Sequence, residues 1–412
     1  MRGWQPLQKR LAAQISRPMA TIHVVAKVGR YSYGLGAVAL NLAKEQIAQG
    51  HDSVVWCLDR PDEVEWGRQL FGLGLRQVRG FATCGPASMG YTPEMERAAL
   101  AGERPDIVHQ HSIWCGLSRV TRQWRKRHRA VTVVAAHGAL QPWALKKSAW
   151  KKKLALLAYE SANLREATCL HACGENEISD YREYSLKNPI ALLPNAISAR
   201  WIESVGDPSR FRAAAGLSGD SRIMLYLSRI TPKKGLPMLI ESMNGLRDRL
   251  KSWILVIAGM DEFGHQRELE AQIRACDLGP HVRFVGPLQG QDKRDAFAAA
   301  DLFVLPTHSE GSPVVVLEAL GAGVPVLTTK GAPWADLLRH DCGWWTDISV
   351  CGIHDALYDA LALPRTVLAA AGERGRNLVT REYSWTKTAS KTIRLYEWLR
   401  GLGPTPEFVH LL

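Results

Sequence analysis

The sequence predicts an α/β protein built from two doubly wound domains, each with a parallel sheet covered by helices on both faces. Short apolar runs with the length of buried strands alternate with helical segments along most of the chain. The alternation pauses over residues 198–221, which contain "VGDPSRF" and "GLSGDS", and then starts again. A chain of 412 residues is long enough for two hydrophobic cores.

The first half of the chain opens with a strand–helix–strand unit. Residues 22–28 form an apolar run of strand length, a glycine-containing loop follows, and apolar spacing predicts a helix over residues 36–49. The next strand is "SVVWCL", and four later runs have similar length: "PDIVHQH", "AVTVVAAHG", "ATCLHACG" and "IALLPNAI". In "VHQHS" we expect His109 and His111 to point to opposite faces, one of them toward a ligand cleft.

The second half repeats this alternation. "SRIMLYLSRITPKKGLPMLIESM" predicts a strand, a basic loop and a helix, and further buried strands are expected at "SWILVIAG", "VRFVGPL", "DLFVLPT" and "VPVLTT". We therefore divide the chain into residues 1–200, residues 201–380 and a C-terminal helical segment, residues 381–412. Ligands of such sheets bind at the carboxyl ends of strands, so the residues directly after each run are the candidates for chemistry.

Composition narrows the class of protein. With 46% apolar and 22% charged residues, the chain is globular. Basic residues interrupt the N-terminus and no window holds about 18 uninterrupted apolar residues, so we expect neither a signal peptide nor a membrane span. Cys169 and Cys173 flank His171 as metal ligands do, but no second cluster completes four ligands. Reduced thiols in a cytoplasmic protein are the favoured interpretation.

The net charge of +12 is concentrated in the first half of the chain. Residues 1–200 hold 28 Lys and Arg against 16 Asp and Glu, whereas residues 201–412 hold 24 of each. Residues 107–159 contain eleven cations and no acid. This half of the protein is therefore expected to meet, or to lie near, something anionic.

Within this basic stretch the cations interleave with Trp124, Trp143 and Trp150. On a helix, Trp143, Trp150, Leu154 and Leu157 would share one face. One interpretation is peripheral docking of residues 119–153 on an anionic membrane at the inner face of the plasma membrane. An ordinary core helix with a solvated basic face fits equally well. Nucleic acid is not expected as a partner, because no binding motif for it appears.

Two glutamates stand in one of the most apolar stretches of the chain, "HSEGSPVVVLEALGAGVPVLTT". Glu310 follows a strand and lies in a loop, whereas Glu318 lies inside a helix that Pro313 begins. Burying a carboxylate is costly without a partner, and we expect a bound ligand to offset that cost. Three residues surround the start of this helix with backbone N–H groups that suit an anion: Gly311, Ser312 and Val314.

The basic loop of the second half is suited to phosphate. Arg229 follows the strand "IMLYL", and Lys234 precedes Gly235 at the start of the next helix. An Arg and a Lys five positions apart can neutralise a diphosphate from two directions and stabilise it as a leaving group. Lys233 is interpreted as an ordinary solvated lysine.

These segments carry a resemblance to a known family. "EGSPVVVLE" followed by "ALGAGVPVLTT" resembles the signature of glycosyltransferase family 4, whose members are retaining, nucleotide-sugar-dependent enzymes. "LYLSRITPKKGLPMLIESM" and "RFVGPLQGQDKRDAFAAADLFVLPTHSEG" are similar to other segments of the family, and the resemblance covers roughly residues 20–400. It implies the GT-B fold, in which two Rossmann-like domains face each other across a cleft and a C-terminal helix crosses back to the first domain.

The resemblance also implies a substrate context. "ALQPWALKKSAWKKKLALLAYE" and "GAPWADLLRHDCGWW" resemble a subgroup associated with bacterial surface polysaccharides, such as lipopolysaccharide or exopolysaccharide. The implied acceptor is a glycan or a lipid-linked glycan, bound by the first domain, and the donor is a nucleotide-diphosphate sugar. No cofactor and no metal are expected, because GT-B enzymes do not need a metal.

The resemblance implies a role for individual residues. Glu310 would hold hydroxyls of the donor sugar, and Glu318 would accept hydrogen bonds from the ribose. His137, at the end of the strand "VTVVAA", would bond the donor sugar or position the acceptor. Closure of the two domains would bring His137 to Arg229, Lys234 and Glu310.

A glycine-rich loop of the family corresponds to "YGLG" in this chain. Gly34 and Gly36 would let the backbone approach the donor closely. The pattern does not complete a G-x-G-x-x-G dinucleotide fingerprint, because position 39 is Ala39.

Two other functions remain open at this stage. The same fold hosts sugar-nucleotide epimerases and phosphorylases, and the fold alone does not choose among them. A non-catalytic protein that binds membranes or anionic polymers is the alternative outside enzymes. Both glutamates, together with Arg229 and Lys234, favour sugar transfer.

Overall fold

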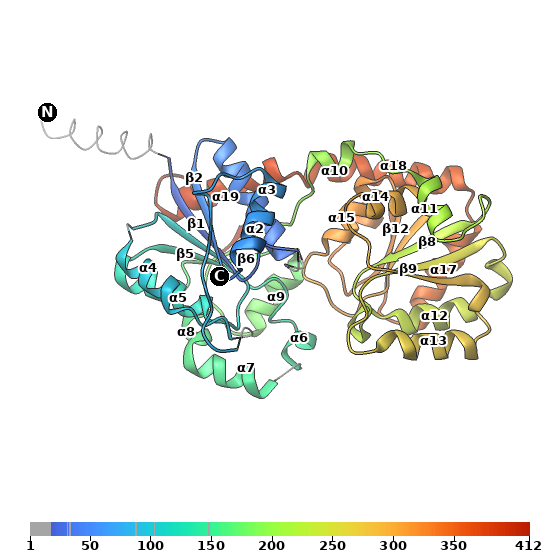
Figure 1. Ribbon diagram of the computed structural model, residues 1–412, viewed down its shortest axis with the longest axis horizontal. Helices are drawn as coiled ribbons and strands as arrows, with labels where there is room; N and C mark the ends of the chain where they lie inside the picture. The colour runs from blue at the N-terminus through green and yellow to red at the C-terminus, as the bar shows by residue number, and fades with distance from the viewer. Residues whose placement is uncertain (1–17, 31, 33, 87–88, 103, 147–148) are drawn as a thin grey trace, which may run out of the picture. The chain divides into compact units, whose positions relative to one another are not determined.

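The computed structural model describes residues 18–30, 32, 34–86, 89–102, 104–146 and 149–412 (Figure 1). The N-terminal residues that bear on a signal peptide lie outside this part of the chain. Two compact units are formed: unit 1 contains the residues up to Pro194 together with Trp385–Leu412, and unit 2 contains Asn195–Ser384. Each unit is built around one predominantly or wholly parallel sheet.

The sheet of unit 1 has eight strands in the order β14-β7-β6-β5-β4-β1-β2-β3. All neighbours pair in parallel except β14 and β7. The direction of the strand order reverses between β1 and β4, which marks the switch point of the sheet. The strands are β1 Ala20–Val25, β2 Asp52–Cys57, β3 Val78–Gly80, β4 Ile107–His111, β5 Val131–Ala135, β6 Cys169–Ala172, β7 Ile190–Leu192 and β14 Val409–His410.

Helices cover both faces of this sheet. The C-terminal helix α19 packs against α2, where Thr386 Oγ1 donates to Glu45 Oε2 (2.9 Å) and Ser390 Oγ donates to Gln49 Oε1 (2.8 Å). Helix α5 contacts both α4 and α8 in a second group. The helices are α2 Leu35–Ala48, α3 Pro61–Phe71, α4 Pro93–Ala101, α5 Leu117–His128, α6 Pro142–Lys146, α7 Ala149–Ala155, the π-helix η2 Leu156–Glu160, α8 Ser161–Arg165, α9 Glu175–Glu183 and α19 Trp385–Leu399.

The sheet of unit 2 has six parallel strands in the order β10-β9-β8-β11-β12-β13. Its switch point lies between β8 and β11. Because both faces are covered, β9 and β11 are almost entirely apolar and buried. The strands are β8 Arg222–Leu227, β9 Trp253–Ala258, β10 Val282–Gly286, β11 Leu302–Leu305, β12 Val326–Thr329 and β13 Gly343–Thr346.

The helices of unit 2 fall into two groups, which Figure 1 shows on either side of its sheet. Helix α12 packs against α13 and α17, whereas α15 packs against α18 and α14 against α11. The helices are α10 Ala199–Glu203, α11 Pro208–Ala214, α12 Leu236–Asn244, α13 His265–Ala275, α14 Gly290–Ala299, α15 Val314–Gly321, α16 Asp336–Arg339, α17 Val350–Ala362 and α18 Arg365–Glu382, with short 3-10 turns at η3 Pro232–Lys234, η4 Arg247–Arg249 and η5 Gly279–His281. The predicted fold class of two doubly wound domains is confirmed.

Candidate functional site

The loops that follow β8 and β11 meet at the switch point of unit 2. The backbone N–H of His308 donates to the carbonyl oxygen of Lys233 (2.9 Å), and Thr307 Oγ1 donates to the same oxygen (3.2 Å). Gly235 has a φ of +72°, and a Cβ at this position would lie 1.9 Å from the carbonyl oxygen of Pro306. Only glycine fits there, so the close approach of the two loops is built into the sequence.

Lys234 and Glu310 form an ion pair where these loops meet. Lys234 Nζ donates to Glu310 Oε1, and the two side chains are 8% and 15% exposed. Thr307 Oγ1 donates to the same carboxylate oxygen (3.2 Å), and the Glu310 N–H donates to the carbonyl oxygen of Gly331 (2.7 Å). The structure therefore brings together two of the residues that the sequence analysis singled out, and places them at the carboxyl ends of adjacent strands.

Two further cations belong to the loop after β8. Arg229 Nη1 donates to both carboxylate oxygens of Glu262, at 2.8 and 2.9 Å. Lys233 is half-buried, and burial lowers its pKa, although the nearby Glu310 opposes that shift. The interpretation of Lys233 as an ordinary solvated lysine was therefore wrong. Its ammonium group lies in the field of Arg229, Lys234 and Glu310.

Glu318 has a partner that the sequence analysis missed. Lys293 on α14 lies with Nζ 2.5 Å from Glu318 Oε2, and the same ammonium is 5.4 Å from the ring centroid of Trp201. The Trp201 indole N–H donates to the carbonyl oxygen of Glu318 (2.9 Å). Both glutamates thus have a lysine partner, so the expectation that only a bound ligand offsets their burial was wrong.

The segment between the two glutamates leads into α15. Pro313 is the N-terminal cap of the helix, in an extended conformation, and Val314 is its first residue. The Val316 N–H bonds the carbonyl oxygen of Pro313 (3.0 Å). Gly311 and Ser312 precede the helix, and Asn195 Nδ2 donates to the carbonyl oxygen of Ser312 (3.0 Å). The bond from Val316 and the bond from Asn195 therefore both hold the start of α15. This helix start lies at the same edge of the sheet as Glu310.

In unit 1, the two predicted loop glycines have backbone reasons for being glycine. Gly34 caps α2 with a φ of +93°. A Cβ on Gly36 would lie 2.4 Å from the carbonyl oxygen of Lys27 and 2.8 Å from the Cα of Val28. The first turn of α2 therefore lies directly against the loop that leaves β1.

His137 lies two residues after the end of β5 and is held inside unit 1. Its Nε2 is 3.2 Å from His111 Nδ1, and its Nδ1 is 3.3 Å from Cys173 Sγ. Burial lowers the pKa of His137 to about 3. Its φ is +50°, which is unusual for a residue other than glycine. The remaining predicted catalytic residues, Arg229 among them, belong to unit 2.

The expectation that His109 and His111 point to opposite faces was wrong. Side chains alternate along a strand, so residues two positions apart share a face. The two rings stack on one face of the sheet, with centroids 4.4 Å apart and both side chains buried.

Among the described residues, His23, His109 and His111 form one group whose ring nitrogens lie close enough to hold a metal ion, all within 4.8 Å of one another. Hydrogen bonds already engage both nitrogens of each of these rings. The group is buried in unit 1, whereas the phosphate-binding candidates belong to unit 2. Cys169 and Cys173 are buried and form no disulfide.

The loop after β4 contains residues in a left-handed backbone conformation that no sequence pattern predicts. Ser112 and Trp114 have φ values of +79° and +72°. Glu160, at the end of the π-helix η2, accepts from the Trp114 N–H (2.8 Å) and from Ser118 Oγ (2.9 Å). Left-handed backbone at the carboxyl end of a switch-point strand is typical of ligand-binding loops. We therefore add this loop to the candidate site of unit 1.

The basic stretch of unit 1 divides into two parts. In α5, Arg119 pairs with Glu96, and Arg122 and Arg125 share Glu166, so these three cations have acidic partners outside the stretch. Trp124 is a buried core residue, which excludes it from any surface role. The side chain of Trp143 lies outside the described residues.

The second part of the basic stretch has an exposed apolar face. Trp150, Leu154 and Leu157 on α7 and η2 are 65%, 58% and 85% exposed, and Lys151 and Lys153 beside them are exposed as well. The interpretation of this segment as a core helix was therefore wrong. In the described part of the chain, no helix combines the length and the apolar character needed to cross a bilayer.

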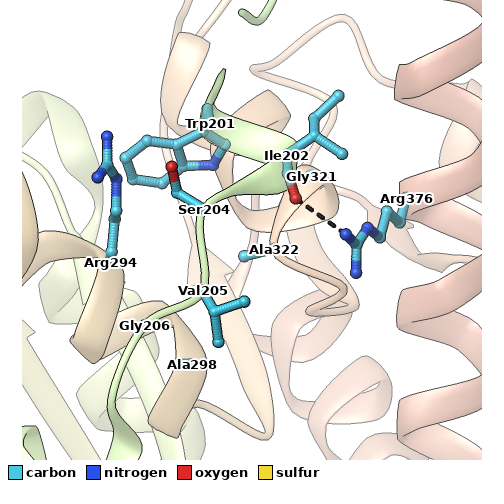
Figure 2. Close-up of a pocket in the computed structure, with 10 residues that line it drawn as sticks. All are labelled: Trp201, Ile202, Ser204, Val205, Gly206, Arg294, Ala298, Gly321, Ala322 and Arg376. Atoms are coloured by element: carbon cyan, nitrogen blue, oxygen red, sulfur yellow. Dashed lines mark hydrogen bonds between the residues drawn. The ribbon is translucent and has the colours of Figure 1, made fainter. Parts of the chain in front are cut away.

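A pocket of about 120 Å³ lies at the other end of α15 (Figure 2). Its wall includes Trp201, Gly321 and Arg376, and Arg376 Nη2 donates to the carbonyl oxygen of Ile202 (2.9 Å). Figure 2 shows the guanidinium of Arg294 pointing away from that of Arg376. The two arginines therefore do not converge on one ligand.

Comparison with known proteins also divides the chain into two parts, each of which matches a glycosyltransferase family model. Residues 33–196 match the glycosyl transferase 4-like domain, and residues 208–377 match the glycosyl transferases group 1. A GDP-mannose:cellobiosyl-diphosphopolyprenol alpha-mannosyltransferase from Komagataeibacter xylinus is 25% identical over 393 residues, covering 93% of this chain and 94% of that protein. A GDP-mannose-dependent alpha-(1-6)-phosphatidylinositol monomannoside mannosyltransferase from Mycobacterium tuberculosis is 30% identical over 192 residues, which cover 44% of this chain and 48% of that relative.

Solved structures show the same architecture. A sucrose-phosphate synthase from Thermosynechococcus elongatus superimposes with a TM-score of 0.75 at 19% identity, covering 93% of this chain and 100% of that chain. The two family matches occupy consecutive parts of this chain and together span most of it. The chain therefore belongs to glycosyltransferase family 4 and has the GT-B fold, as the resemblance predicted.

Proposed function

We propose that this glycosyltransferase moves a sugar from a nucleotide-diphosphate sugar to a hydroxyl group of a lipid-linked glycan in bacterial surface polysaccharide synthesis. The Lys234–Glu310 ion pair at the switch point of unit 2 carries this proposal. It joins a phosphate-binding cation to a hydroxyl-binding carboxylate at the place where doubly wound sheets bind ligands.

In the proposed donor complex, this ion pair exchanges its partners. Lys234 and Arg229 form ion pairs with the diphosphate, and the sugar hydroxyls donate hydrogen bonds to Glu310. Glu318 accepts from the ribose hydroxyls while Lys293 keeps its carboxylate ionised and oriented. Negative charge grows on the leaving phosphate as the glycosidic bond breaks, so cations fixed there lower the barrier.

The reaction is proposed to retain the anomeric configuration and to need no metal. The family resemblance supports retention, with the acceptor hydroxyl attacking the face that the phosphate leaves and the phosphate accepting its proton. The cations of the loop after β8 supply the charge that a metal would otherwise bring to the diphosphate. NMR assignment of the product anomer, and assays with and without EDTA, test both statements.

A mannose donor and a polyprenol-linked acceptor are the first choice for assays. The Komagataeibacter relative is named as acting from GDP-mannose on a cellobiosyl-diphosphopolyprenol, and it aligns with this chain over nearly its full length. Thermal shift against GDP, UDP, ADP and their sugar derivatives identifies the donor. Stabilisation by none of them contradicts the proposed function.

The assay must also separate transfer from the two other functions. A transferase releases nucleoside diphosphate only when acceptor is present. An epimerase converts the donor without acceptor, and a phosphorylase requires inorganic phosphate. A non-catalytic binding protein turns over no donor under any of these conditions.

We also propose that α7 and η2 dock unit 1 on an anionic membrane. The exposed Trp150, Leu154 and Leu157 can enter the boundary between headgroups and acyl chains, and Lys151 and Lys153 can contact anionic lipid. This surface would hold the enzyme beside an acceptor carried on a lipid diphosphate.

A further inference from the structure

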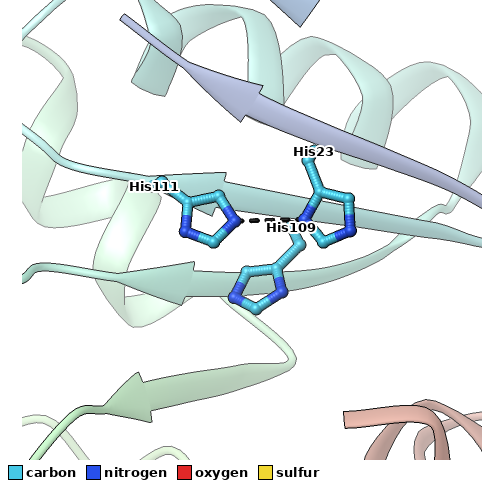
Figure 3. A group of neighbouring side chains, drawn as sticks. All are labelled: His23, His109 and His111. Carbon is cyan, nitrogen blue, oxygen red and sulfur yellow. Dashed lines mark hydrogen bonds between the residues drawn. The ribbon is translucent and has the colours of Figure 1, made fainter. Parts of the chain in front are cut away.

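Five histidines of unit 1 gather on one side of its sheet. His23 comes from β1, His109 and His111 from β4, His137 from the residue pair after β5, and His171 from β6. Four of them are buried and His137 is half-buried. Figure 3 shows three of the rings and the hydrogen bond that joins His23 to His111.

One chain of hydrogen bonds runs from Tyr396 on α19 into the sheet. Tyr396 Oη is 2.6 Å from His109 Nδ1, and His109 Nε2 is 3.0 Å from His171 Nδ1. His171 Nε2 is 2.7 Å from the carbonyl oxygen of Leu193. A carbonyl oxygen can only accept, so His171 carries its proton on Nε2. His109 then donates from Nε2, and the Tyr396 hydroxyl donates to His109.

The other chain runs from Cys173, whose Sγ also lies 3.7 Å from His171 Nε2, to Gln46 on α2. Cys173 Sγ is 3.3 Å from His137 Nδ1, and His137 Nε2 is 3.2 Å from His111 Nδ1. His111 Nε2 is 3.1 Å from His23 Nδ1, and His23 Nε2 is 2.8 Å from Gln46 Oε1. Each ring therefore uses one nitrogen toward each of its neighbours.

The amide of Gln46 sets the direction of this chain. Its Oε1 accepts from Ser53 Oγ (2.7 Å) as well as from His23 Nε2, so the proton of His23 is on Nε2. His111 and His137 must then also carry their protons on Nε2. Every bond in the chain is satisfied with neutral rings. A second proton on His23 or His111 would face another N–H, and one on His137 would face the Cys173 thiol in place of accepting from it. Burial, which lowers the pKa of His23 to about 4, favours the same neutral state.

We propose that this chain fixes His137 as a neutral ring and presents its Nδ1 as an acceptor for a hydroxyl group of the sugar substrate. The present partner of Nδ1 is the Cys173 thiol, a weak donor that a hydroxyl can replace. An ionised phosphate oxygen has no proton to donate and is rejected at this nitrogen. The inference rests on the proposed function, and it makes His111, His23 and Gln46 positioning residues that act through His137.

NMR spectroscopy of the intact chain with nitrogen-labelled histidine tests the tautomers directly, because protonated and unprotonated ring nitrogens differ in chemical shift. We expect His137, His111 and His23 to be neutral and protonated on Nε2 at pH 7. A His137 that is cationic at pH 7, or protonated on Nδ1, would overturn the proposal. This measurement needs neither a variant nor a substrate.

Two conservative variants test which group sets the tautomer. Gln46→Met removes the terminal acceptor of the chain and should shift His137 toward the tautomer protonated on Nδ1. Ser242→Ala is the matched control, because it removes buried hydrogen bonds to the carbonyl oxygens of Met238 and Val350 in unit 2 and should leave His137 unchanged. An unchanged His137 spectrum in Gln46→Met would refute the positioning role.

Kinetics separate positioning from general support of the fold. His111→Asn and His137→Asn should each lower kcat/KM roughly tenfold, the order of one hydrogen bond lost in the transition state. The double variant should also lose roughly tenfold, because His111 acts through His137. A loss near a hundredfold would show independent contributions and contradict the inference.

Ligand titration identifies the group that His137 recognises. GDP-mannose should perturb the His137 Nδ1 resonance while the ring stays neutral, and GDP, which lacks the sugar, should not. Equal perturbation by GDP would overturn the hydroxyl assignment. If neither ligand binds, the proposed donor is wrong, whereas the tautomers of the free protein still decide whether the chain positions His137.

Discussion

Lys293 Nζ lies 2.5 Å from Glu318 Oε2, and the two residues belong to α14 and α15, which are separated in the chain by the strand β11. Both side chains are mostly buried, so each supplies the charge that compensates the other's lost hydration. The pair holds the carboxylate in place within unit 2, beside Trp201. Glu318 is thus oriented by the protein itself, as its proposed role in binding the ribose requires.

Replacing Lys293 should therefore destabilise unit 2. We expect Lys293→Met to cost about 3 kcal/mol, because it leaves a mostly buried carboxylate without its cation. Urea unfolding measures the loss. The exposed pair Lys330–Asp347 provides the control, since Lys330→Met should cost less than about 1 kcal/mol. Equal losses of unfolding free energy in the two variants would show that the buried Lys293–Glu318 pair contributes no more stability than an exposed ion pair.

The two glutamates should affect different kinetic constants. Glu310→Gln should lower kcat about 100-fold with little change in donor KM, because the contacts to the sugar that we propose for it would strengthen in the transition state. Glu318→Gln should raise the donor KM about tenfold, because it weakens ribose binding in ground and transition states alike. Steady-state kinetics with varied donor distinguish the two. The same change of both constants in both variants would contradict this division of roles.

Gly235 should be intolerant of any side chain. A Cβ would meet the carbonyl oxygen of Pro306 at 1.9 Å, and its φ of +72° is also unfavourable for alanine. We expect Gly235→Ala to lower the stability of unit 2 by more than about 2 kcal/mol and to weaken nucleotide binding by separating the two loops. Gly216→Ala is the control: its φ is +63° but nothing lies within 4 Å, so only the cost of about 1 kcal/mol for the conformation should remain.

Unit 1 should lose stability as the pH falls. Burial lowers the pKa of His23 and His171 to about 4 and that of His137 to about 3, so the unfolded chain takes up protons first below about pH 6.5. Each histidine then removes up to about 1.4 kcal/mol of stability per pH unit until its folded pKa is reached. Glu177 opposes this, because burial raises its pKa to about 7 and its contribution grows as the pH falls.

Urea unfolding between pH 7.5 and 5.5 measures this dependence. His109 and His111 add to the loss, since their pKa values are also lowered well below the usual value by burial, and Asp180, whose pKa is raised to about 6 by burial, joins Glu177 in opposing it. Replacing the exposed His410 by Gln should leave the slope unchanged. A stability independent of pH over this range would contradict the neutral histidine chains.

Membrane docking should depend on the exposed apolar face of α7 and η2. The triple variant Trp150→Ser, Leu154→Ser and Leu157→Ser should lose most of its binding to anionic vesicles in a flotation assay. Leu75→Ser is the control, since Leu75 is 77% exposed elsewhere in unit 1. Wild-type recovery with neutral vesicles should be low, since each lysine near an anionic surface contributes about 1 kcal/mol. Equal recovery with both vesicle types would contradict the proposal.

Sequence patterns were sufficient for the fold because strand-length apolar runs and helical spacing are local properties. The same patterns located Lys234 and Glu310 at the ends of strands, and the structure shows them paired. They did not reveal Lys293, because the register between α14 and α15 decides which cation of "QDKRDAF" reaches Glu318. The interpretation of Lys233 as solvated failed for a related reason, since the loop that packs against it, at His308, comes 75 residues later in the chain.

The histidine chains lay beyond sequence reasoning for a further reason. Each ring is explained by its neighbours on other strands, and only the parallel register β1–β4–β5–β6 brings them together. The alternation of side chains along a strand does predict that His109 and His111 share a face. Our expectation of opposite faces therefore misapplied strand geometry and did not lack information. Neither the left-handed backbone of Trp114 nor its contact with Glu160 has a signature in the sequence.

The return of α19 and β14 to unit 1 determines when that unit can be completed during synthesis. Asn195–Ser384 is continuous, so unit 2 leaves the ribosome with all of its parts while unit 1 still lacks its last helix and edge strand. Until α19 arrives, the apolar surface that Ile393, Leu395 and Tyr396 cover is open. The nascent chain therefore passes through a stage in which its second domain is whole and its first is unfinished, and that stage is where chaperones would have a surface to bind.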